Sequence, residues 1–142
     1  MKYSPLYFFL IVMCYINGES SKGPYRAKKD IECWKIMELV LDGGKEVLYS
    51  PIVPGPGYNI GDTIHCAVRK FKNNKLNAWW HRRKTFFHGE VVHAYVNKTG
   101  PSISYRPWVR CVIPKGSYYW TDGEEIVAFD IRLEEIIKYP IP

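Results

Sequence analysis

The most distinctive chemical feature of the sequence is a stretch in which cations alternate with aromatic rings. It contains Trp79, Trp80, Arg82, Arg83 and Lys84. Cations attract phosphate or sulfate groups, and aromatic faces stack on bases, sugars or lipid headgroups. We therefore predict that these five residues bind an anionic polymer, a glycan or a membrane surface, ahead of a specific nucleic acid. The alternative interpretation is that the rings pack in or beside the core and the cations form a solvated turn.

Charge is unevenly distributed along the chain around that stretch. The net charge is +6, and seven Lys and Arg residues with no acid lie between Asp62 and Glu90. From Asp122 to Glu135 the sign reverses, with six acids and one arginine. One region of the sequence is thus strongly basic and another strongly acidic, which favours a basic face as the binding surface.

A histidine in an apolar segment, His93, is the candidate for acid–base chemistry. Its partner would be a carboxylate of the acidic region, namely Glu124, Glu125 or Asp130. Convergence of such a pair in a cleft would favour an enzyme, and burial of His93 among aliphatic side chains would favour a structural role. The sequence lacks HxH, HExxH and GxSxG motifs and a glycine-rich phosphate loop. We therefore assign no catalytic residue, and expect neither a metal nor a cofactor.

Two kinds of modification site stand out. Asn97-Lys98-Thr99 is an N-glycosylation sequon, followed by Gly100-Pro101 and so expected in a turn. Cys33, Cys66 and Cys111 are candidates for a disulfide, of which at most one can form within the chain; three buried reduced cysteines are the alternative. Their spacing resembles no zinc or CxxC pattern.

The N-terminus has the pattern of a secretory leader. Lys2 is followed by an apolar run over residues 6–16 and by small polar residues. The run is shorter than the roughly 20 residues that span a bilayer. We predict a signal peptide over residues 1–18 and a secreted or extracytoplasmic protein. A signal anchor through residues 6–16 is the alternative, and Cys14 as a lipoprotein cysteine is disfavoured by Met13 before it.

The remaining chain of about 120 residues is long enough for one domain. Residues 19–31 are small, polar and basic, and we expect them to form a flexible lead-in. Residues 32–142 would then form a single β-rich domain. Its elements must position every candidate described above.

Alternation of apolar and polar residues predicts strands and not helices. Hairpin turns are expected at Asp42-Gly43-Gly44-Lys45 and at Asp122-Gly123. The expected strands are residues 32–41, 46–49, 63–71, 90–96, 108–113, 117–120 and 127–133, with one short helix possible over 76–84. The predicted fold is mostly β, α+β being the alternative: a single curled sheet or partly open barrel with at most one or two short helices.

Several short segments resemble uncharacterised small β-rich domains of Bacteroidota, their phages and giant viruses. They are Cys33-Trp34-Lys35-Ile36-Met37, Tyr49-Ser50-Pro51, Tyr58 with Gly61, the run from Gly89 to Tyr95, the run from Val109 to Gly116, and Gly123-Glu124-Glu125-Ile126-Val127. The resemblance spans Cys33 to Ile137 and implies an architecture without an assigned activity. This chain departs from that pattern in its leader and in lacking a cysteine or phenylalanine before the histidine strand.

The segment ending in Ile113-Pro114-Lys115-Gly116 is also similar to a late strand of ADP-ribosyltransferases. Those enzymes carry a catalytic glutamate just before that apolar run, where this chain has Arg110. The resemblance therefore implies a diverged enzyme without that carboxylate. Two functions are carried forward: a non-enzymatic secreted or surface-displayed binding module with a basic aromatic face, and a diverged enzyme, ADP-ribosyltransferase-like or of another type that uses His93.

Overall fold

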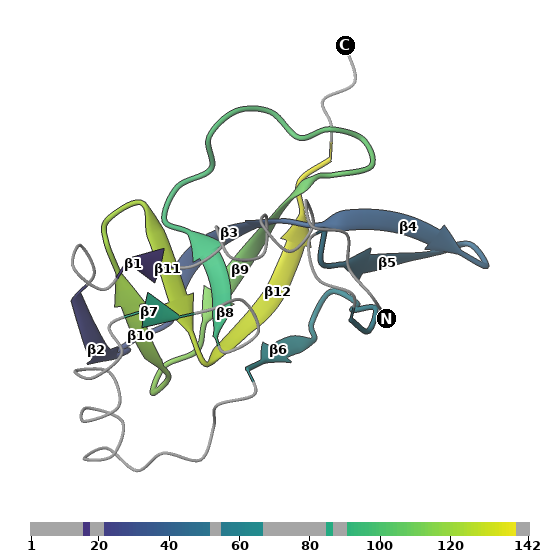
Figure 1. Ribbon diagram of the computed structural model, residues 1–142. Coiled ribbons are helices and arrows are strands. Elements are labelled where there is room, and N and C mark those ends of the chain that lie inside the picture. Colours follow the sequence, from purple (N-terminus) through teal and green to yellow (C-terminus); the bar gives the residue numbers. More distant parts are fainter. Residues whose placement is uncertain (1–15, 18–21, 52–54, 67–84, 87–90, 139–142) are drawn as a thin grey trace.

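A computed structural model describes residues 16–17, 22–51, 55–66, 85–86 and 91–138 of the 142-residue chain (Figure 1). Every regular element in these ranges is a strand. The mostly β fold predicted from the sequence is thus confirmed. The basic aromatic residues Trp79 to Lys84, the short helix considered over 76–84 and nearly all of the leader lie outside the described ranges.

In the part of the chain that the structure describes, twelve strands form three sheets. They are β1 (Ile16–Asn17), β2 (Lys22–Arg26), β3 (Ile31–Ile36), β4 (Glu38–Asp42), β5 (Lys45–Tyr49), β6 (Thr63–His65), β7 (Thr85–Phe86), β8 (Val92–Tyr95), β9 (Trp108–Ile113), β10 (Tyr118–Thr121), β11 (Glu125–Ala128) and β12 (Asp130–Ile136). The main antiparallel sheet has the order β2-β10-β11-β8-β3-β9-β12-β6. The pairs β4-β5 and β1-β7 form the two small sheets.

The main sheet curls because the consecutive strands β11 and β12 belong to two different parts of it. Only Phe129 separates β11 from β12, yet β11 pairs with β8 while β12 pairs with β9. Phe129 is buried against Trp120, with ring centroids 5.4 Å apart. Its amide donates to the carbonyl of Tyr118 and its carbonyl accepts from Cys66. We expected a single strand over residues 127–133, and the structure breaks it at this buried aromatic corner.

A second expected strand, over residues 32–41, is also divided. Its first part is the central strand β3, held between β8 and β9, and its second part is β4, which turns away to pair with β5. Opposite the junction lies Pro107, which precedes β9 and cannot donate a backbone hydrogen bond. Met37, buried at the junction, donates instead to the carbonyl of Pro107. The hairpin predicted at Asp42-Gly43-Gly44-Lys45 is confirmed, and this hairpin projects from the main sheet (Figure 1).

The expected lead-in over residues 19–31 contributes to the sheet from Lys22 onward. β2 pairs with β10 at the sheet edge, and Ala27 is buried in the core. The error has a physical cause: the charged residues and Pro24 that argued against packing are tolerated on an edge strand, where one row of backbone groups faces solvent. Gly23 permits the close approach, since a Cβ at that position would lie 2.8 Å from Trp120 Cδ1.

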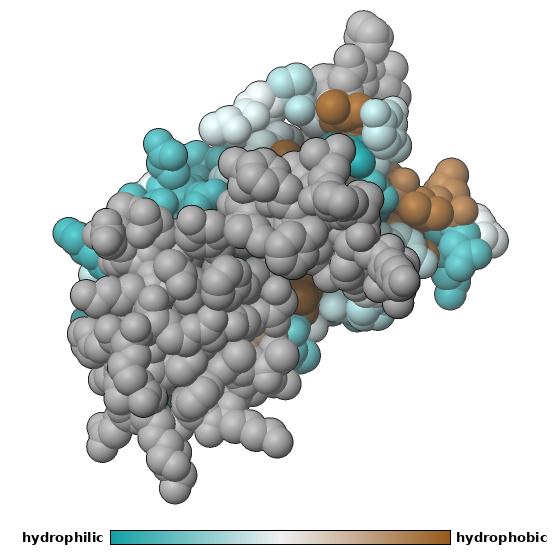
Figure 2. Space-filling view, in the orientation of Figure 1, coloured by the Kyte–Doolittle hydropathy of each residue, from teal (hydrophilic) through white to brown (hydrophobic). Residues whose placement is uncertain are grey.

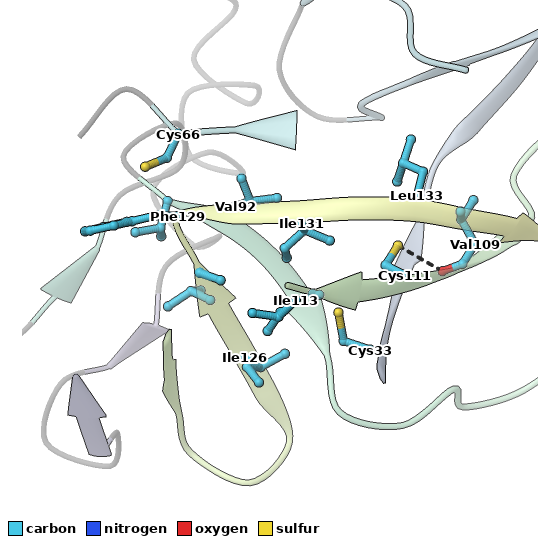
Figure 3. Close-up of a cluster of buried hydrophobic side chains, with 14 of the residues drawn as sticks. Cys33, Cys66, Val92, Val109, Cys111, Ile113, Ile126, Phe129, Ile131 and Leu133 are labelled. Carbon is cyan, nitrogen blue, oxygen red and sulfur yellow. Dashed lines mark hydrogen bonds between the residues drawn. The ribbon is translucent and has the colours of Figure 1, made fainter. Parts of the chain in front are cut away.

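The core lies on the inner side of the curl and contains all three described cysteines (Figure 3). Cys33 and Cys111 are directly opposite each other on β3 and β9, and Cys66 lies near Phe129. No disulfide joins any two of these three cysteines. The cysteines considered for a disulfide are thus packed as small apolar side chains, as in the alternative interpretation. The most exposed of the large hydrophobic side chains described is Leu41, which lies with Val40 toward the tip of the projecting β4-β5 hairpin (Figure 2).

Candidate ligand-binding pocket

The candidate site lies where β8 and β11 end together. The antiparallel register places Tyr95 of β8 directly opposite Glu125 of β11, and His93 opposite Val127. Side chains two residues apart on a strand share a face, so His93, Tyr95 and Glu125 lie on one side of the sheet. The pairing continues past the end of β8, because the Val96 amide donates to the carbonyl of Glu124 at 2.8 Å.

A pocket of about 330 Å³ is present at this end of the strands. Its lining consists of Tyr95, Asn97, Thr99, Gly123, Glu124 and Glu125. Alternate residues of one segment form one wall, and the turn between β10 and β11 forms the other. The volume falls at the lower end of the range found for small-molecule sites.

The turn that forms the second wall is held by its own side chains. Asp122 Oδ1 accepts hydrogen bonds from the amides of Glu124 and Glu125, at 2.9 and 2.7 Å. Thr121 Oγ1 donates to the carbonyl of Glu125 at 2.7 Å and accepts from the amide of Gly123 at 3.0 Å. Gly123 has a φ of 97°, which glycine adopts without steric cost. The hairpin predicted from Asp122-Gly123 is confirmed, and it fixes both glutamates of the pocket.

His93 supports the pocket from behind Glu125. Its Nε2 lies 3.2 Å from Glu125 Oε1, and the two side chains are 18% and 32% exposed. The imidazole ring also packs edge-on against Tyr95, with centroids 5.1 Å apart, and Tyr95 packs in the same way on Trp108 at 5.8 Å. Glu125 faces the pocket and His93 does not belong to its lining. The histidine therefore orients a carboxylate and an aromatic ring that a ligand would touch.

The pocket is polar and carries negative charge. Glu124 and Glu125 are its two charged residues, and Asn97 and Thr99 add a neutral amide and a hydroxyl. The neighbouring cation, Lys98, donates to the carbonyl of Gly100 at 3.2 Å and is not part of the lining. This combination disfavours an anionic ligand here, and suits a ligand with hydroxyl groups and an apolar face.

A second histidine–carboxylate pair lies at the corner between β11 and β12. His65 Nδ1 contacts Asp130 Oδ1, and Ser117 Oγ donates to Asp130 Oδ2 at 3.2 Å. The residue types are those of a hydrolytic triad, but the order differs. In a triad the histidine stands between serine and acid, so that it can take the serine proton. Here the carboxylate stands between them, and the cluster braces the corner.

Two acids near the end of the acidic region are paired with arginines. Glu134 contacts Arg132, and Glu135 Oε1 lies 3.5 Å from Arg110 Nε. Arg110 thus forms a surface ion pair. Asp130 is engaged with His65, so of the three carboxylates proposed for His93 only Glu125 contacts it.

Three side chains of the central strands β3 and β9 have pKa values shifted by burial. Burial raises the pKa of Cys111 to about 12, and raises that of Cys33 further. Burial lowers the pKa of Lys35, whose Nζ donates to the carbonyl of His93. High thiol pKa values make these cysteines poor nucleophiles and poor metal ligands at neutral pH. Within the described ranges, no group of three His, Cys, Asp or Glu side chains could hold a metal ion.

Sequence reasoning located some of these residues and missed others. The basic aromatic candidates Trp79, Trp80, Arg82, Arg83 and Lys84 lie outside the described residues, so their role stays a prediction. Asn97 is exposed, as a sequon must be, and lines the pocket. Tyr95 and Thr99 were missed as site residues. The available signal was their closeness in sequence to the sequon residue Asn97, since Tyr95 ends β8 and the chain then bends.

Comparisons with known proteins add no relative: no family model, no curated protein and no solved structure matches the chain. The resemblances noted from the sequence therefore stay predictions. Among the residues that the structure describes, none forms a helix long and apolar enough to cross a membrane.

Proposed function

We propose that this protein is a small secreted or surface-displayed binding module, without enzymatic activity, whose pocket beside Tyr95 recognises a carbohydrate. The observation that carries the proposal is the lining of the pocket: one aromatic ring, one amide, one hydroxyl and two carboxylates on two braced walls. An aromatic face packs against the C–H face of a pyranose, and the polar groups bond its hydroxyls. The basic aromatic stretch Trp79 to Lys84 would provide a second contact surface.

Rigidity supports recognition over catalysis. The turn holding Glu124 and Glu125 is fixed by four hydrogen bonds to Asp122 and Thr121, and Tyr95 is packed between His93 and Trp108. A preformed site binds with a smaller entropic cost. His93 contacts Glu125 and is not part of the pocket lining, so the group best suited to proton transfer is not among those that would touch the ligand.

The test uses wild-type protein produced in a bacterial cytosol, so that Asn97 stays unmodified. A panel of neutral mono- and oligosaccharides is titrated while amide NMR shifts are followed. We expect saturable shifts at Tyr95, Asn97 and Glu124. Glu124→Gln should weaken binding about fivefold, since a charged hydrogen-bond acceptor is lost. Glu135→Gln, an exposed carboxylate outside the pocket, is the matched control and should leave affinity unchanged.

Two results would contradict the proposal. One is binding of lysine- or arginine-containing peptides at the pocket with no response to any sugar, which would make it a cation site built on carboxylates and a tyrosine ring. The other is equal weakening by Glu124→Gln and Glu135→Gln, which would show that binding follows overall charge and not the pocket.

A diverged enzyme is the second candidate, and the His93–Glu125 contact is the observation that favours it. A histidine beside a carboxylate is the usual arrangement of a general base. If the pair is catalytic, the protein should hydrolyse an activated glycoside or ester, and His93→Gln should abolish the reaction. If the wild type shows no turnover and His93→Gln only weakens ligand binding, the result would instead support the binding module.

A further inference from the structure

The sequon lies within the proposed binding pocket. Asn97 and Thr99, which are the acceptor and the recognition residue of the sequon, line the pocket together with Tyr95, Glu124 and Glu125. We propose that Asn97 is N-glycosylated during secretion and that its first N-acetylglucosamine occupies this pocket, so that glycosylation closes the site to other ligands. The inference rests on the proposed function, because it names what regulates the same pocket.

The local backbone directs the attached sugar toward the pocket. β8 ends at Tyr95 and the chain bends at Val96 and Asn97, and Tyr95, Asn97 and Thr99 all line the pocket. A sugar linked to the Asn97 amide nitrogen therefore starts at the pocket wall and lies within reach of the Tyr95 ring. The ring is fixed on its other sides by His93 and Trp108 and provides a firm platform.

The opposite wall provides polar partners for that sugar. Glu124 is exposed and Glu125 is 32% exposed on its side chain, so both carboxylates can accept hydrogen bonds from sugar hydroxyls. The backbone turn that carries them is held by Asp122 and needs no rearrangement. A tethered sugar has a high effective concentration at the pocket, of the order of millimolar or more for a short tether, and so excludes weakly bound free sugars.

The modification is an ordinary group transfer. The co-reactant is a lipid-linked oligosaccharide diphosphate of the secretory pathway. The bond from its terminal sugar C1 to the diphosphate oxygen breaks, and a bond from C1 to Asn97 Nδ2 forms. The amide loses one proton, and the lipid diphosphate leaves with the bonding electron pair. No oxidant or reductant is required.

The experiment compares three forms of the wild-type chain. One is secreted from cultured animal cells and carries the complete glycan at Asn97. The second is the same protein trimmed by an endoglycosidase that leaves a single N-acetylglucosamine. The third, the stripped form, is produced in a bacterial cytosol and carries no glycan, so that Asn97 keeps its amide. If the first sugar fills the pocket, the complete and trimmed forms should melt together, about 3 °C above the stripped form, the shift expected for about 1 kcal/mol in a domain of this size.

Two variants test where the sugar lies. Tyr95→Leu removes the aromatic platform, and should reduce the difference in melting temperature between trimmed and stripped forms to below 1 °C. A matched control moves the sequon to the exposed β4-β5 hairpin through Asn97→Gln, Lys45→Asn and Val47→Thr. Here the trimmed and stripped forms should melt at the same temperature, because no pocket receives the sugar.

Failure of this inference and failure of the proposed function are distinguishable. An unoccupied Asn97 in the secreted protein, or a trimmed form that melts with the stripped form, would overturn the inference whatever the unmodified pocket binds. Sugar binding by the bacterial protein that is at least tenfold weaker in the trimmed form would support both. A bacterial protein that binds no sugar would remove the proposed function, while a stabilising single sugar would still place the glycan in the pocket.

Discussion

Two histidine–carboxylate pairs of this protein use the same residue types for different ends. His93 and Glu125 lie across β8 and β11 at the edge of a pocket, and His65 and Asp130 lie across β6 and β12 at a corner of the sheet. The difference is what the second carboxylate oxygen can reach. Asp130 receives a hydrogen bond from Ser117, while Glu125 faces the pocket. A histidine–carboxylate pair therefore does not define a function until the partner of the second carboxylate oxygen is known.

The corner pair should have the largest effect on stability. Asp130→Ala leaves the Ser117 hydroxyl and the His65 ring without their shared acceptor, and should lower the free energy of unfolding by about 2 kcal/mol. Urea denaturation measures the loss, and sugar titration should show unchanged affinity in the folded variant. A variant as stable as the wild type would mean that the corner does not depend on this cluster.

The buried thiols of Cys33 and Cys111 extend the comparison from the solvent-exposed side of the sheet to its core. The pKa of Cys111 is 9.0 for an unperturbed thiol and about 12 in the folded protein. Its contribution is fully present below pH 9, and is lost as pH rises toward 12 because only the unfolded chain releases the proton. Between pH 8 and 10 the wild type should lose about 1.4 kcal/mol more than Cys111→Ala. Parallel pH profiles would show that this thiol reaches water in the folded state.

The pocket pair should affect binding more than stability. Glu125→Gln keeps the shape of the side chain and removes its charge, so it should weaken sugar binding about fivefold, equivalent to about 1 kcal/mol. Its melting temperature should stay within about 2 °C of the wild type, because partly exposed ion pairs contribute little. A large loss of stability with unchanged affinity would make this pair structural, like the corner pair.

The smallest effect is expected at Ser117. Its hydrogen bond to Asp130 is 3.2 Å long and partly buried, so Ser117→Ala should cost about 0.5 kcal/mol and leave the His65–Asp130 contact in place. Asp130→Ala combined with Ser117→Ala should then cost less than the sum of the single changes. Additive losses would mean that serine and aspartate act independently.

Local signals were enough for much of the fold. Asp42-Gly43-Gly44-Lys45 and Asp122-Gly123 predicted their hairpins because tight turns need residues that adopt positive φ. The strand over residues 108–113 was also found as it stands in the structure. Breaks caused by partners far along the chain were not predictable. Apolar alternation continues through Phe129, and only the switch from β8 to β9 ends the strand there.

Part of the candidate site could also be predicted from local signals. Asn97 is identified by a local motif, and His93 and Glu125 were both considered, but their contact depends on the pairing of strands about 30 residues apart, which a single sequence does not specify. The pocket itself forms where residues 95–99 and the turn between β10 and β11 lie side by side. No residue spacing within either segment predicts that they are neighbours.

Because a single residue joins β11 to β12, two strands that have β8, β3 and β9 between them in the sheet are tied by covalent bonds as well as through that hydrogen-bonded sheet. We therefore expect the strands between them to open together. Amide protons buried in β8 and in β9 should therefore exchange with deuterium through one shared opening, at rates that change together on addition of low urea. A chain that appears assembled from many short strands would then unfold as one cooperative unit, and a cut at Phe129 would divide the molecule into two pieces that must be held together to persist.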